Sequence, residues 1–250
     1  MRVRLDFAAT VAKDPERPDL NEDAFKQGLN SDVFALSDGA SESYDSKSWA
    51  QMLVSKYSEN LTFNYEWVEA AQKNYAATVD FQSLSWSKQL AFDRGSFATL
   101  LGLTTFENSC SVFSIGDSLA ALVRNKRIHT SFPFVYPEQF DARPELLSTL
   151  SNLNTFAQDS EFNIAEHQTS WEIEDGDTVF MMTDAVGQWF LREINFENSS
   201  AQALLDISTE DEFQSLICLL RSEKRIKLDD STLLRFVVDS SDISNGISND

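Results

Sequence analysis

Carboxylates stand at the ends of several apolar runs, where strands are expected to stop or start. Asp38 ends the run FALSD, Asp117 follows VFSIG, and Asp184 follows VFMMT. Asp229 and Asp230 precede the apolar run STLLRFVV. Aspartate is a common turn and capping residue, so local structure explains each position taken singly. The acids of NED (21–23) end the first loop. Because strand ends in a sheet sandwich lie close together, all these positions jointly predict an acidic cluster.

An acidic cluster of this kind requires a cation. At about 4 Å, two carboxylates repel by roughly 4 kcal/mol at an effective dielectric constant of 20. All the candidate ligands are oxygen donors, and neither of the chain's 2 histidines has a partner at zinc-like spacing. The chemical match is therefore a hard divalent cation, Mg²⁺ or Mn²⁺. The chain has no GxSxG motif, which lowers the odds of a serine nucleophile.

Strands that group with strands, and helices with helices, predict an α+β fold with antiparallel sheets. Apolar alternation predicts a first strand over residues 2–10, with Val3, Leu5 and Phe7 on one face. The short β-rich runs from Ser96 to Phe132 are interpreted as an antiparallel meander. Further strands are expected at the runs DVFALSD, TSWEIED, DTVFMMTD and STLLRFVVD.

Helical spacing predicts a helix that begins at Asp45 or Ser46, one over residues 65–79, and a third in SWSKQLAFD. A short helix is expected in VGQWFLREI, and an amphipathic helix capped by Ser208 or Thr209 follows it. Residues 132–165 show no sustained period and are interpreted as a long excursion.

Length and charge narrow the possible classes of protein. The 250 residues fit one domain over residues 1–240, followed by a polar tail at 241–250. A net charge of −20 argues against nucleic acid and anionic membranes as partners. No apolar run approaches the roughly 20 residues of a membrane span, and no signal-peptide core follows the start. We expect a cytoplasmic monomer.

The cysteines and the basic residues indicate neither a metal or disulfide motif nor a binding surface. Cys110 and Cys218 are far apart, without CxxC spacing, and are interpreted as reduced core thiols. The only basic cluster is RSEKRIK, from Arg221 to Lys227, which Glu223 interrupts. It is interpreted as a solvated helix end rather than a binding patch.

The order of the motifs resembles that of the metal-dependent Ser/Thr protein phosphatases of PPM type, also called type 2C. The motifs in question are NEDAF (21–25), FALSDGAS (34–41), RGSFATLLGL (94–103), FSIGDSLAAL (113–122), GDTVFMMTDAVGQWF (176–190) and LDDSTLLRF (228–236). None of them is specific alone, but the six occur in family order and span nearly the whole chain.

The resemblance implies a four-layer αββα sandwich, in which two central antiparallel β-sheets are flanked by helices. It also implies two metal ions, Mn²⁺ or Mg²⁺, at one end of the sandwich, with Asp38 bridging both and the Gly39 carbonyl binding one. Asp184 and Asp229 would bind the other, and Asp117 resembles the family residue that joins Asp184 at a weaker third metal.

Two further acids, Glu22 and Asp23, would orient metal-bound waters by the same resemblance. A hydroxide held between metals roughly 3.5 to 4 Å apart would attack phosphorus in line, without a nucleophile from the protein. Gly39 suits its position because a side chain would obstruct the approach of the backbone to a metal, and because glycine permits the necessary dihedral.

Three departures from the family pattern bear on activity. The arginine that commonly grips phosphate is replaced by Pro18, and the nearest arginine is Arg17, which a loop shift could deliver but which could also simply be solvated. The family's DGxG reads DGAS, so Ala40 replaces a histidine that acts as general acid in some relatives. The later SDG reads TDA, with Ala185 in place of glycine.

Residues 132–155 fall where the family carries a flap beside the active site, and they are rich in Phe, Tyr and Pro. This segment could select the substrate, or its aromatic side chains could be buried over the sheet. The sequence thus predicts a phosphatase that hydrolyses phosphoserine or phosphothreonine in phosphorylated proteins. The alternative is a catalytically silent module that keeps the fold and binds or regulates.

Overall fold

The computed structural model describes residues 1–29, 32–41, 43–154, 164–193 and 200–240. Its strands are β1 (Arg2–Val11), β2 (Ala24–Gln27), β3 (Val33–Ser37), β4 (Phe97–Ala98), β5 (Leu100–Thr105), β6 (Ser109–Ile115), β7 (Leu119–Arg124), β8 (Arg127–Phe132), β9 (Leu147–Ser148), β10 (Gln168–Glu172), β11 (Thr178–Met182) and β12 (Ser231–Asp239). The α-helices are α1 (Ser46–Glu59), α2 (Tyr65–Ala77), α3 (Trp86–Phe92), α5 (Asp184–Arg192), α6 (Ser200–Asp206) and α7 (Glu210–Ser222). The 3-10 turns are η1 (Pro18–Leu20), η2 (Phe81–Ser83), η3 (Pro137–Asp141), η4 (Ser151–Leu153) and η5 (Ile164–Glu166).

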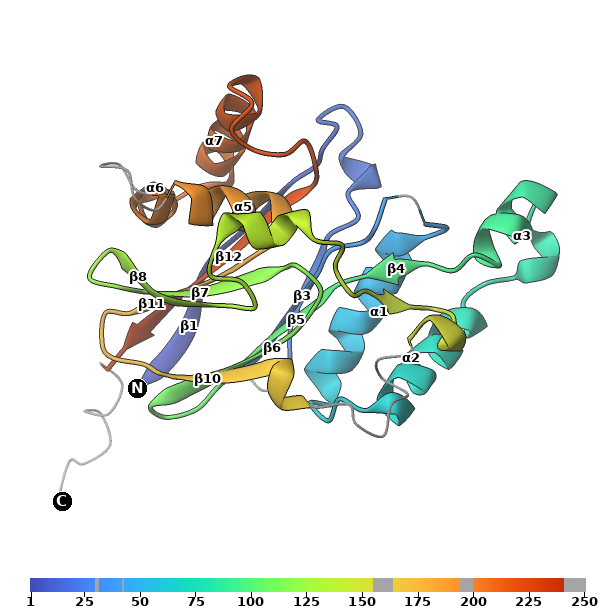
Figure 1. The fold of residues 1–250 in the computed structure, drawn as a ribbon, viewed down its shortest axis with the longest axis horizontal. Coiled ribbons are helices and arrows are strands. Elements are labelled where there is room, and N and C mark those ends of the chain that lie inside the picture. Colours follow the sequence, from blue (N-terminus) through green and yellow to red (C-terminus); the bar gives the residue numbers. More distant parts are fainter. Residues whose placement is uncertain (30–31, 42, 155–163, 194–199, 241–250) are drawn as a thin grey trace, which may run out of the picture.

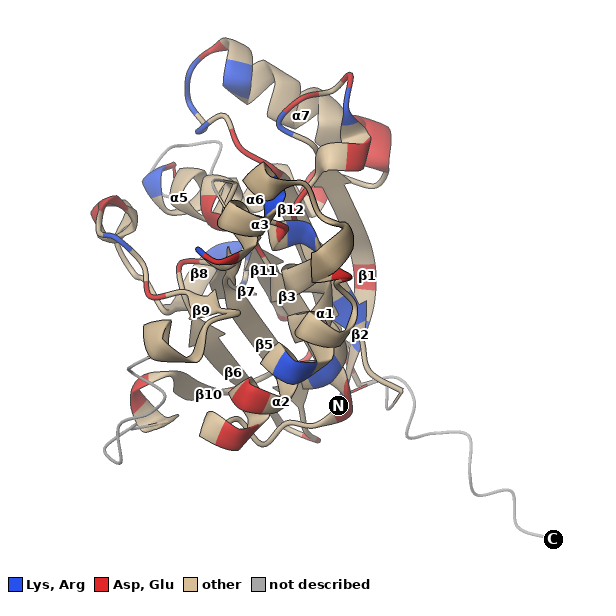
Figure 2. Ribbon diagram, turned by 90° about the vertical axis from the view of Figure 1, so that its right-hand side faces the viewer, with Lys and Arg blue, Asp and Glu red and all other residues tan. Residues whose placement is uncertain are grey.

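Two five-stranded sheets form the centre of the molecule (Figure 1). The first has the order β1-β12-β11-β7-β8 and the second the order β10-β6-β5-β3-β2. Neighbouring strands pair antiparallel in both sheets. The strands β3, β5 and β6 carry no charged residue, as their uniform colour in Figure 2 shows. Such uncharged strands suit a sheet that is covered on both faces.

Three buried clusters separate four layers. Leu36, Leu101 and Phe236 belong to the cluster between the two sheets. Trp49 belongs to the cluster that packs α1 and α2 on the second sheet, and Phe190 to the one that packs α5, α6 and α7 on the first sheet. The predicted αββα sandwich is thus confirmed.

Local capping explains where the longer helices begin. The Asp45 side chain accepts a hydrogen bond from the Ser48 amide at 3.2 Å and starts α1. Thr209 and Glu212 form a capping box at the start of α7. Both caps agree with the sequence prediction. None of the helices in the described ranges is long and apolar enough to cross a membrane.

A bulge in β1 overturns the prediction that Val3, Leu5 and Phe7 share one face. The register of β1 against β12 shifts between Leu5 and Phe7, which turns the rest of the strand over. Val3 therefore faces the cluster between the sheets, whereas Phe7 packs under the helices and contacts Phe213.

The expected meander over residues 96–132 is divided between the two sheets. Strands β5 and β6 pair in one sheet, and β7 and β8 pair in the other. The chain changes sheets at Gly116, whose φ of +104° an L side chain rarely adopts. The two strands expected at TSWEIED and DTVFMMTD are likewise divided, because β10 and β11 lie in different sheets.

Other local interpretations also need correction. Cys110 is buried as expected, but Cys218 is exposed on α7. Strand β2 and helix α6 were not expected from the sequence. The excursion contains η3, β9 and η4, while residues 155–163 and the tail at 241–250 lie outside the described part of the chain.

Candidate metal-dependent active site

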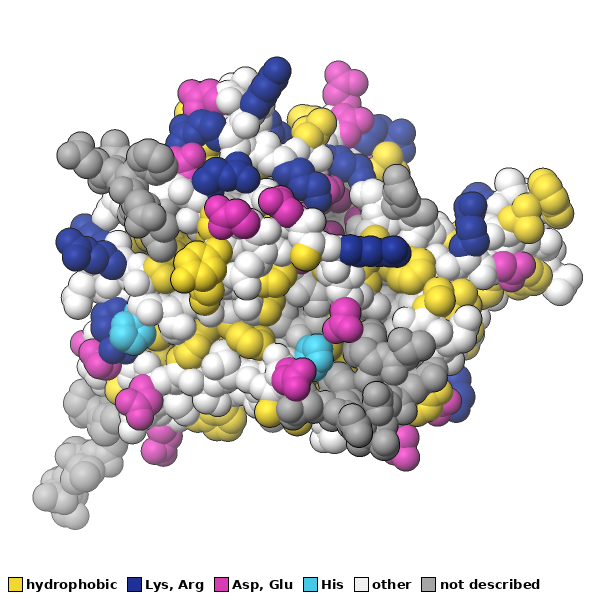
Figure 3. Space-filling view, in the orientation of Figure 1, with side chains coloured by type: hydrophobic (Ala, Val, Ile, Leu, Met, Phe, Trp, Pro, Cys, Tyr) yellow, Lys and Arg dark blue, Asp and Glu magenta, His cyan; other side chains and the backbone are white. Residues whose placement is uncertain are grey.

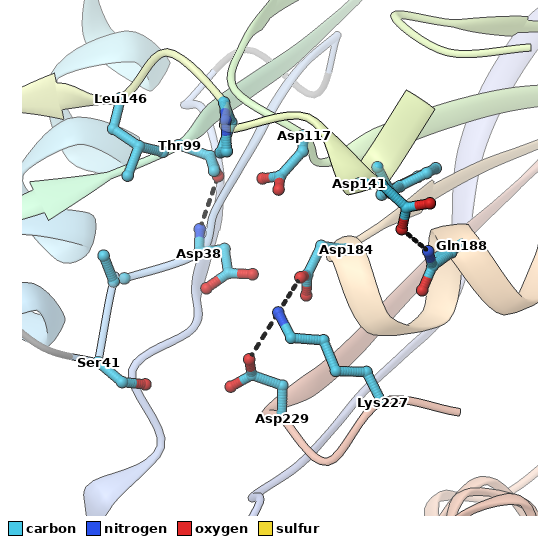
Figure 4. A pocket seen from close by; sticks show the side chains of 14 residues that line it. Asp38, Ser41, Thr99, Asp117, Asp141, Leu146, Asp184, Gln188, Lys227 and Asp229 are labelled. Carbon is cyan, nitrogen blue, oxygen red and sulfur yellow. Dashed lines mark hydrogen bonds and ion pairs between the residues drawn. The ribbon is translucent and has the colours of Figure 1, made fainter. Parts of the chain in front are cut away.

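A cavity of about 420 Å³ opens at one end of the sandwich, where both sheets end. Four of the acids singled out in the sequence line it, and they come from four separate segments (Figure 4). Those acids are Asp38, Asp117, Asp184 and Asp229. The fold therefore brings together residues that lie up to 191 positions apart, the separation of 38 and 229.

Asp38 follows the last residue of β3 and is held by its backbone. Its amide donates to Thr99 Oγ1 at 2.9 Å, and its carbonyl accepts from the Thr99 amide at 2.9 Å. The Thr99 hydroxyl also hydrogen-bonds Ser118 at 2.8 Å in the buried interior. Thr99 thus fixes the backbone from which the Asp38 carboxylate projects into the cavity.

Glycine at position 39 is required by space rather than by its dihedral angle. A Cβ there would lie 2.9 Å from the Glu22 carbonyl oxygen and 2.9 Å from Ser46 Cβ. Gly39 is absent from the glycines with positive φ, so the dihedral part of the sequence argument is wrong. Its close contact with Glu22 brings the segment at residue 22 against the end of β3.

Asp117 and Asp184 stand at two sharp changes of chain direction. Gly116, next to Asp117, has no room for a side chain, since a Cβ would lie 2.7 Å from Thr99 Cγ2. Asp184 is the first residue of α5, and its carboxylate accepts a hydrogen bond from the Ala185 amide at 2.5 Å. A carboxylate in the first turn is stabilised by the helix dipole.

Burial and mutual repulsion raise the pKa of the acids at the base of the cavity. Desolvation, followed by the charges of Asp23 and Asp184, raises the pKa of Asp38 well above its ordinary 3.8. Desolvation and the charge of Asp184 raise the pKa of Asp117 to about 6. Desolvation and repulsion outweigh the positive charge of Lys227 near Asp117, and a bound cation relieves both.

Asp23 lies behind the cavity lining with one oxygen unpaired. Its Oδ2 accepts from Thr232 Oγ1 at 2.6 Å and from Thr183 Oγ1 at 3.2 Å. Its Oδ1 is buried without a hydrogen-bond partner. Desolvation is the largest cause that raises the pKa of Asp23 to about 8, and the charges of Asp230 and Asp184 add to it. We call Asp23 and Asp38 the central pair.

Glu22 is surrounded by donors. Lys13 Nζ donates to Glu22 Oε2 at 2.9 Å, and the Ser46 hydroxyl donates to Glu22 Oε1. Burial alone would raise the pKa of Glu22, but the hydrogen bonds from Ser41, Ser46 and Lys13 outweigh it and lower the pKa below 4.5. Glu22 is therefore held as a carboxylate.

A lysine occupies the space between two of the expected ligands. Lys227 Nζ lies 2.6 Å from Asp184 Oδ2 and 3.1 Å from Asp229 Oδ2 (Figure 4). We call Asp184 and Asp229 the lysine-bound pair. The interpretation of the basic cluster as a solvated helix end is wrong at Lys227, and also at Arg221, which donates to the Asp229 carbonyl at 2.6 Å.

Arg17 does not line the cavity. Its guanidinium donates two hydrogen bonds to Asp19, each of 3.1 Å, and its side chain is 54% exposed. Arg17, the phosphate clamp expected from the sequence, is therefore paired with Asp19 and is not among the residues that line the cavity.

The described part of the predicted flap forms one wall of the cavity. Phe140, Asp141, Pro144 and Leu146 face the opening, and Gln188 Nε2 approaches Asp141 Oδ1 at 3.4 Å. Phe140 lines the cavity and also packs against the core beneath α5, so the alternative of buried aromatic side chains applies to it in part, whereas substrate selection stays a prediction. Figure 3 shows basic and acidic side chains intermixed on this face of the molecule, with hydrophobic patches between them.

Sequence reasoning placed Asp230 in the acidic cluster but missed its role in bonding the backbone, and it missed Thr99 and Lys227. Asp230, buried, accepts from the Lys13 amide at 2.7 Å and from the Glu22 amide at 2.7 Å. The doubled acid in KLDDS could have signalled two roles, one facing the cavity and one bonding to backbone. Thr99 and Lys227 carried no comparable signal.

The donor set fits a hard divalent cation in its chemistry. The carboxylates that face the cavity offer only oxygen, and the orphaned Asp23 Oδ1 is a buried acceptor that lacks a partner. In the described residues, no three His, Cys, Asp or Glu side chains are grouped so that they could hold a metal ion as they stand. Lys227 and the acids around it would have to adjust when a cation binds.

Comparison with known proteins identifies the fold. No family model matches the sequence, and no curated protein is similar to it in sequence. Among solved structures, the Mycobacterium tuberculosis serine/threonine phosphatase PstP/Ppp matches with a TM-score of 0.57 at 15% identity, over 96% of this chain and 100% of that one. Stp1 from Staphylococcus aureus matches with a TM-score of 0.54 at 15% identity, over 96% and 99%.

A further match is the catalytic domain of PstP in complex with two manganese ions, with a TM-score of 0.52 at 17% identity, over 96% of this chain and 100% of that one. These matches extend over nearly the full length of this chain. The chain therefore has the fold of the PPM-type serine/threonine phosphatases.

Proposed function

We propose that this protein is a metal-dependent phosphatase that removes phosphate from phosphoserine or phosphothreonine in proteins. The observation that carries the proposal is the convergence of four aspartates from distant segments on one cavity. A solved structure that shares this fold, the catalytic domain of PstP, is a complex with two manganese ions, as its name records. Among the described residues, no cysteine or histidine lines the cavity.

In this proposal, Asp38, the Gly39 carbonyl, Asp184 and Asp229 hold two divalent ions, Mn²⁺ or Mg²⁺, and Asp117 joins a third. When bound, such ions lower the pKa of water and neutralise charge on phosphoryl oxygens. Glu22 and Asp23 orient water through their carboxylates. Thr99 keeps Asp38 in place, and the wall from Phe140 to Leu146 excludes bulk water from one side.

Arg17 is left outside the proposed machinery because its charge is paired with Asp19. Lys13 is also paired, with Glu22 at 2.9 Å, but it is the better placed cation because it contacts a residue that lines the cavity. Its Nζ lies 2.5 Å from Ser41 Oγ, and Ser41 lines the cavity. A phosphate group in the cavity would therefore find an ammonium group at this edge.

The test is release of phosphate from a phosphothreonine peptide in the presence of Mn²⁺. Activity should disappear with a chelator and should fall more than about 100-fold in Asp38→Asn, because the variant removes a ligand shared by both ions. Asp211→Asn, on the exposed first turn of α7, is the matched control and should keep full activity. Turnover that persists in excess chelator would contradict the proposal.

A second candidate is a catalytically silent module with the same fold. The position of Lys227 between Asp184 and Asp229 favours it, as do the DGAS and TDA segments. Calorimetric titration with Mn²⁺ separates the two candidates. Two or more sites together with phosphate release support the enzyme, whereas a folded protein that binds no Mn²⁺ supports the silent module.

A further inference from the structure

Lys227 reaches the cavity from a loop that is fixed on both sides. The loop joins α7 to β12, and Ile226 beside Lys227 is buried in the core under α7. On the other side, buried Asp230 bonds the backbone of Lys13 and Glu22. The backbone at Lys227 is thus anchored, while 53% of its side chain remains exposed. The ammonium group can leave the acids by rotation of the side chain alone.

The contacts of Lys227 are those of a cation shared by two carboxylates. It donates to Asp184 at 2.6 Å and lies 3.1 Å from Asp229, and both acids line the cavity. Of the described lysines and arginines, Lys227 alone forms an ion pair with either acid. A divalent ion held by the same two carboxylates would have to displace this ammonium group, because like charges cannot share the site.

We propose that Lys227 is a built-in counter-ion that competes with a divalent cation for Asp184 and Asp229. In the absence of metal, its single positive charge offsets part of the negative charge of the lysine-bound pair. As metal concentration rises, the side chain swings out and the carboxylates become available. Lys227 thereby sets the metal concentration at which the site fills. The inference rests on the proposed function, because it requires that the cavity binds divalent cations.

Calorimetric titration of Mn²⁺ into four proteins tests the competition. They are the wild type, Lys227→Met, Lys227→Arg and the control Lys73→Met, which removes an exposed charge on α2 far from the cavity. Lys227→Met should bind its weakest-bound Mn²⁺ about ten-fold more tightly than the wild type. Lys227→Arg keeps the charge and should resemble the wild type, as should Lys73→Met. Equal or weaker binding by Lys227→Met would overturn the inference.

Thermal unfolding supplies a readout that does not depend on activity. In chelator, Lys227→Met should unfold at a lower temperature than Lys73→Met, since its two acids lose their counter-ion. Added Mn²⁺ should then stabilise Lys227→Met more than the wild type. The same shift in both proteins would count against Lys227 as a competitor. If wild type and variant are folded and neither binds Mn²⁺, the proposed function fails together with the inference, whereas failure of the difference alone leaves the proposed function intact.

Discussion

Asp23 and Asp38, the central pair, form no ion pair with any described lysine or arginine, whereas Asp184 and Asp229 share Lys227. The four aspartates of these two pairs thus have two different electrostatic environments within one site. Burial raises the pKa of both members of the central pair, so protonation relieves their charge when no cation is present. The charge of the lysine-bound pair is instead offset in part by the Lys227 side chain. The negative charge of neighbouring carboxylates is thus reduced in two ways within one site, by protonation at the central pair and by an ion pair with lysine at the other.

The pH dependence of stability is the broadest test of this difference. An acid whose pKa rises on folding binds more protons in the folded state, so its stabilising effect is complete below the ordinary pKa and is lost as pH rises through the folded pKa. For Asp23 that interval runs from 3.8 to about 8. Between about pH 5.5 and about pH 8, the metal-free protein should lose roughly 3 kcal/mol of unfolding free energy, at about 1.36 kcal/mol per pH unit.

Urea unfolding in chelator at the two pH values measures this loss. Asp23→Asn should flatten the dependence, and saturating Mn²⁺ should stabilise the wild type more at the higher pH. Asp211→Asn, on an exposed helix turn, should leave the slope unchanged. A wild-type stability that is level across the interval would remove the distinction between the two pairs.

Neutralising one acid from each pair sharpens the comparison. Asp38→Asn should raise the unfolding free energy of the metal-free protein near pH 8 by more than about 1 kcal/mol, because it removes a charge whose burial is uncompensated. Asp229→Asn should leave stability within about 0.5 kcal/mol or lower it, since Asp229 is already paired with a half-exposed lysine. Urea unfolding of both variants in chelator gives the two values. Destabilisation by Asp38→Asn would show that its charge is already compensated.

Hydrogen bonds at the base of the cavity should contribute more stability than those at its edge. Thr99→Val leaves the Asp38 amide and the Ser118 hydroxyl without partners in the interior, which should cost about 2 kcal/mol. Ser41→Ala removes an exposed hydroxyl beside Lys13 and should change stability by less than about 0.5 kcal/mol. Thermal unfolding ranks the two variants. A loss in Ser41→Ala equal to that in Thr99→Val would place the edge of the cavity under the same constraint as its base.

The fold and most of the acids could be predicted because their signals are local. Apolar runs mark strands, and an acid at the end of a run marks the edge of a sheet, so Asp38, Asp117 and Asp184 were found without knowledge of the pairing. Which sheet a strand joins is not a local property. The run from β5 to β8 looks like one meander, and only the turn at Gly116 sends its second half into the other sheet.

The remaining errors arise where identical residue types have different surroundings. Lys227 ends a run of basic residues that resembles a solvated helix terminus, and nothing in RSEKRIK indicates which of its charges turns toward the acids. The bulge that moves Phe7 to the other face of β1 likewise leaves the apolar alternation unchanged. Tertiary contacts decide the orientation of both Lys227 and Phe7. Neither the apolar alternation nor a count of charges can therefore predict it.

The smallest effect is expected at Arg17, which lies outside both pairs. Arg17→Ala removes an exposed ion pair with Asp19, so stability should change by less than about 1 kcal/mol and KM for a phosphothreonine peptide by less than about twofold. Lys13→Met should raise KM several-fold more than Arg17→Ala, because Lys13 contacts Ser41 at the cavity and carries a charge that phosphate can reach. Steady-state kinetics with Mn²⁺ compares the two variants. A larger effect of Arg17→Ala would mean that the loop before η1 rearranges on substrate binding and delivers the arginine that the sequence pattern places near this position.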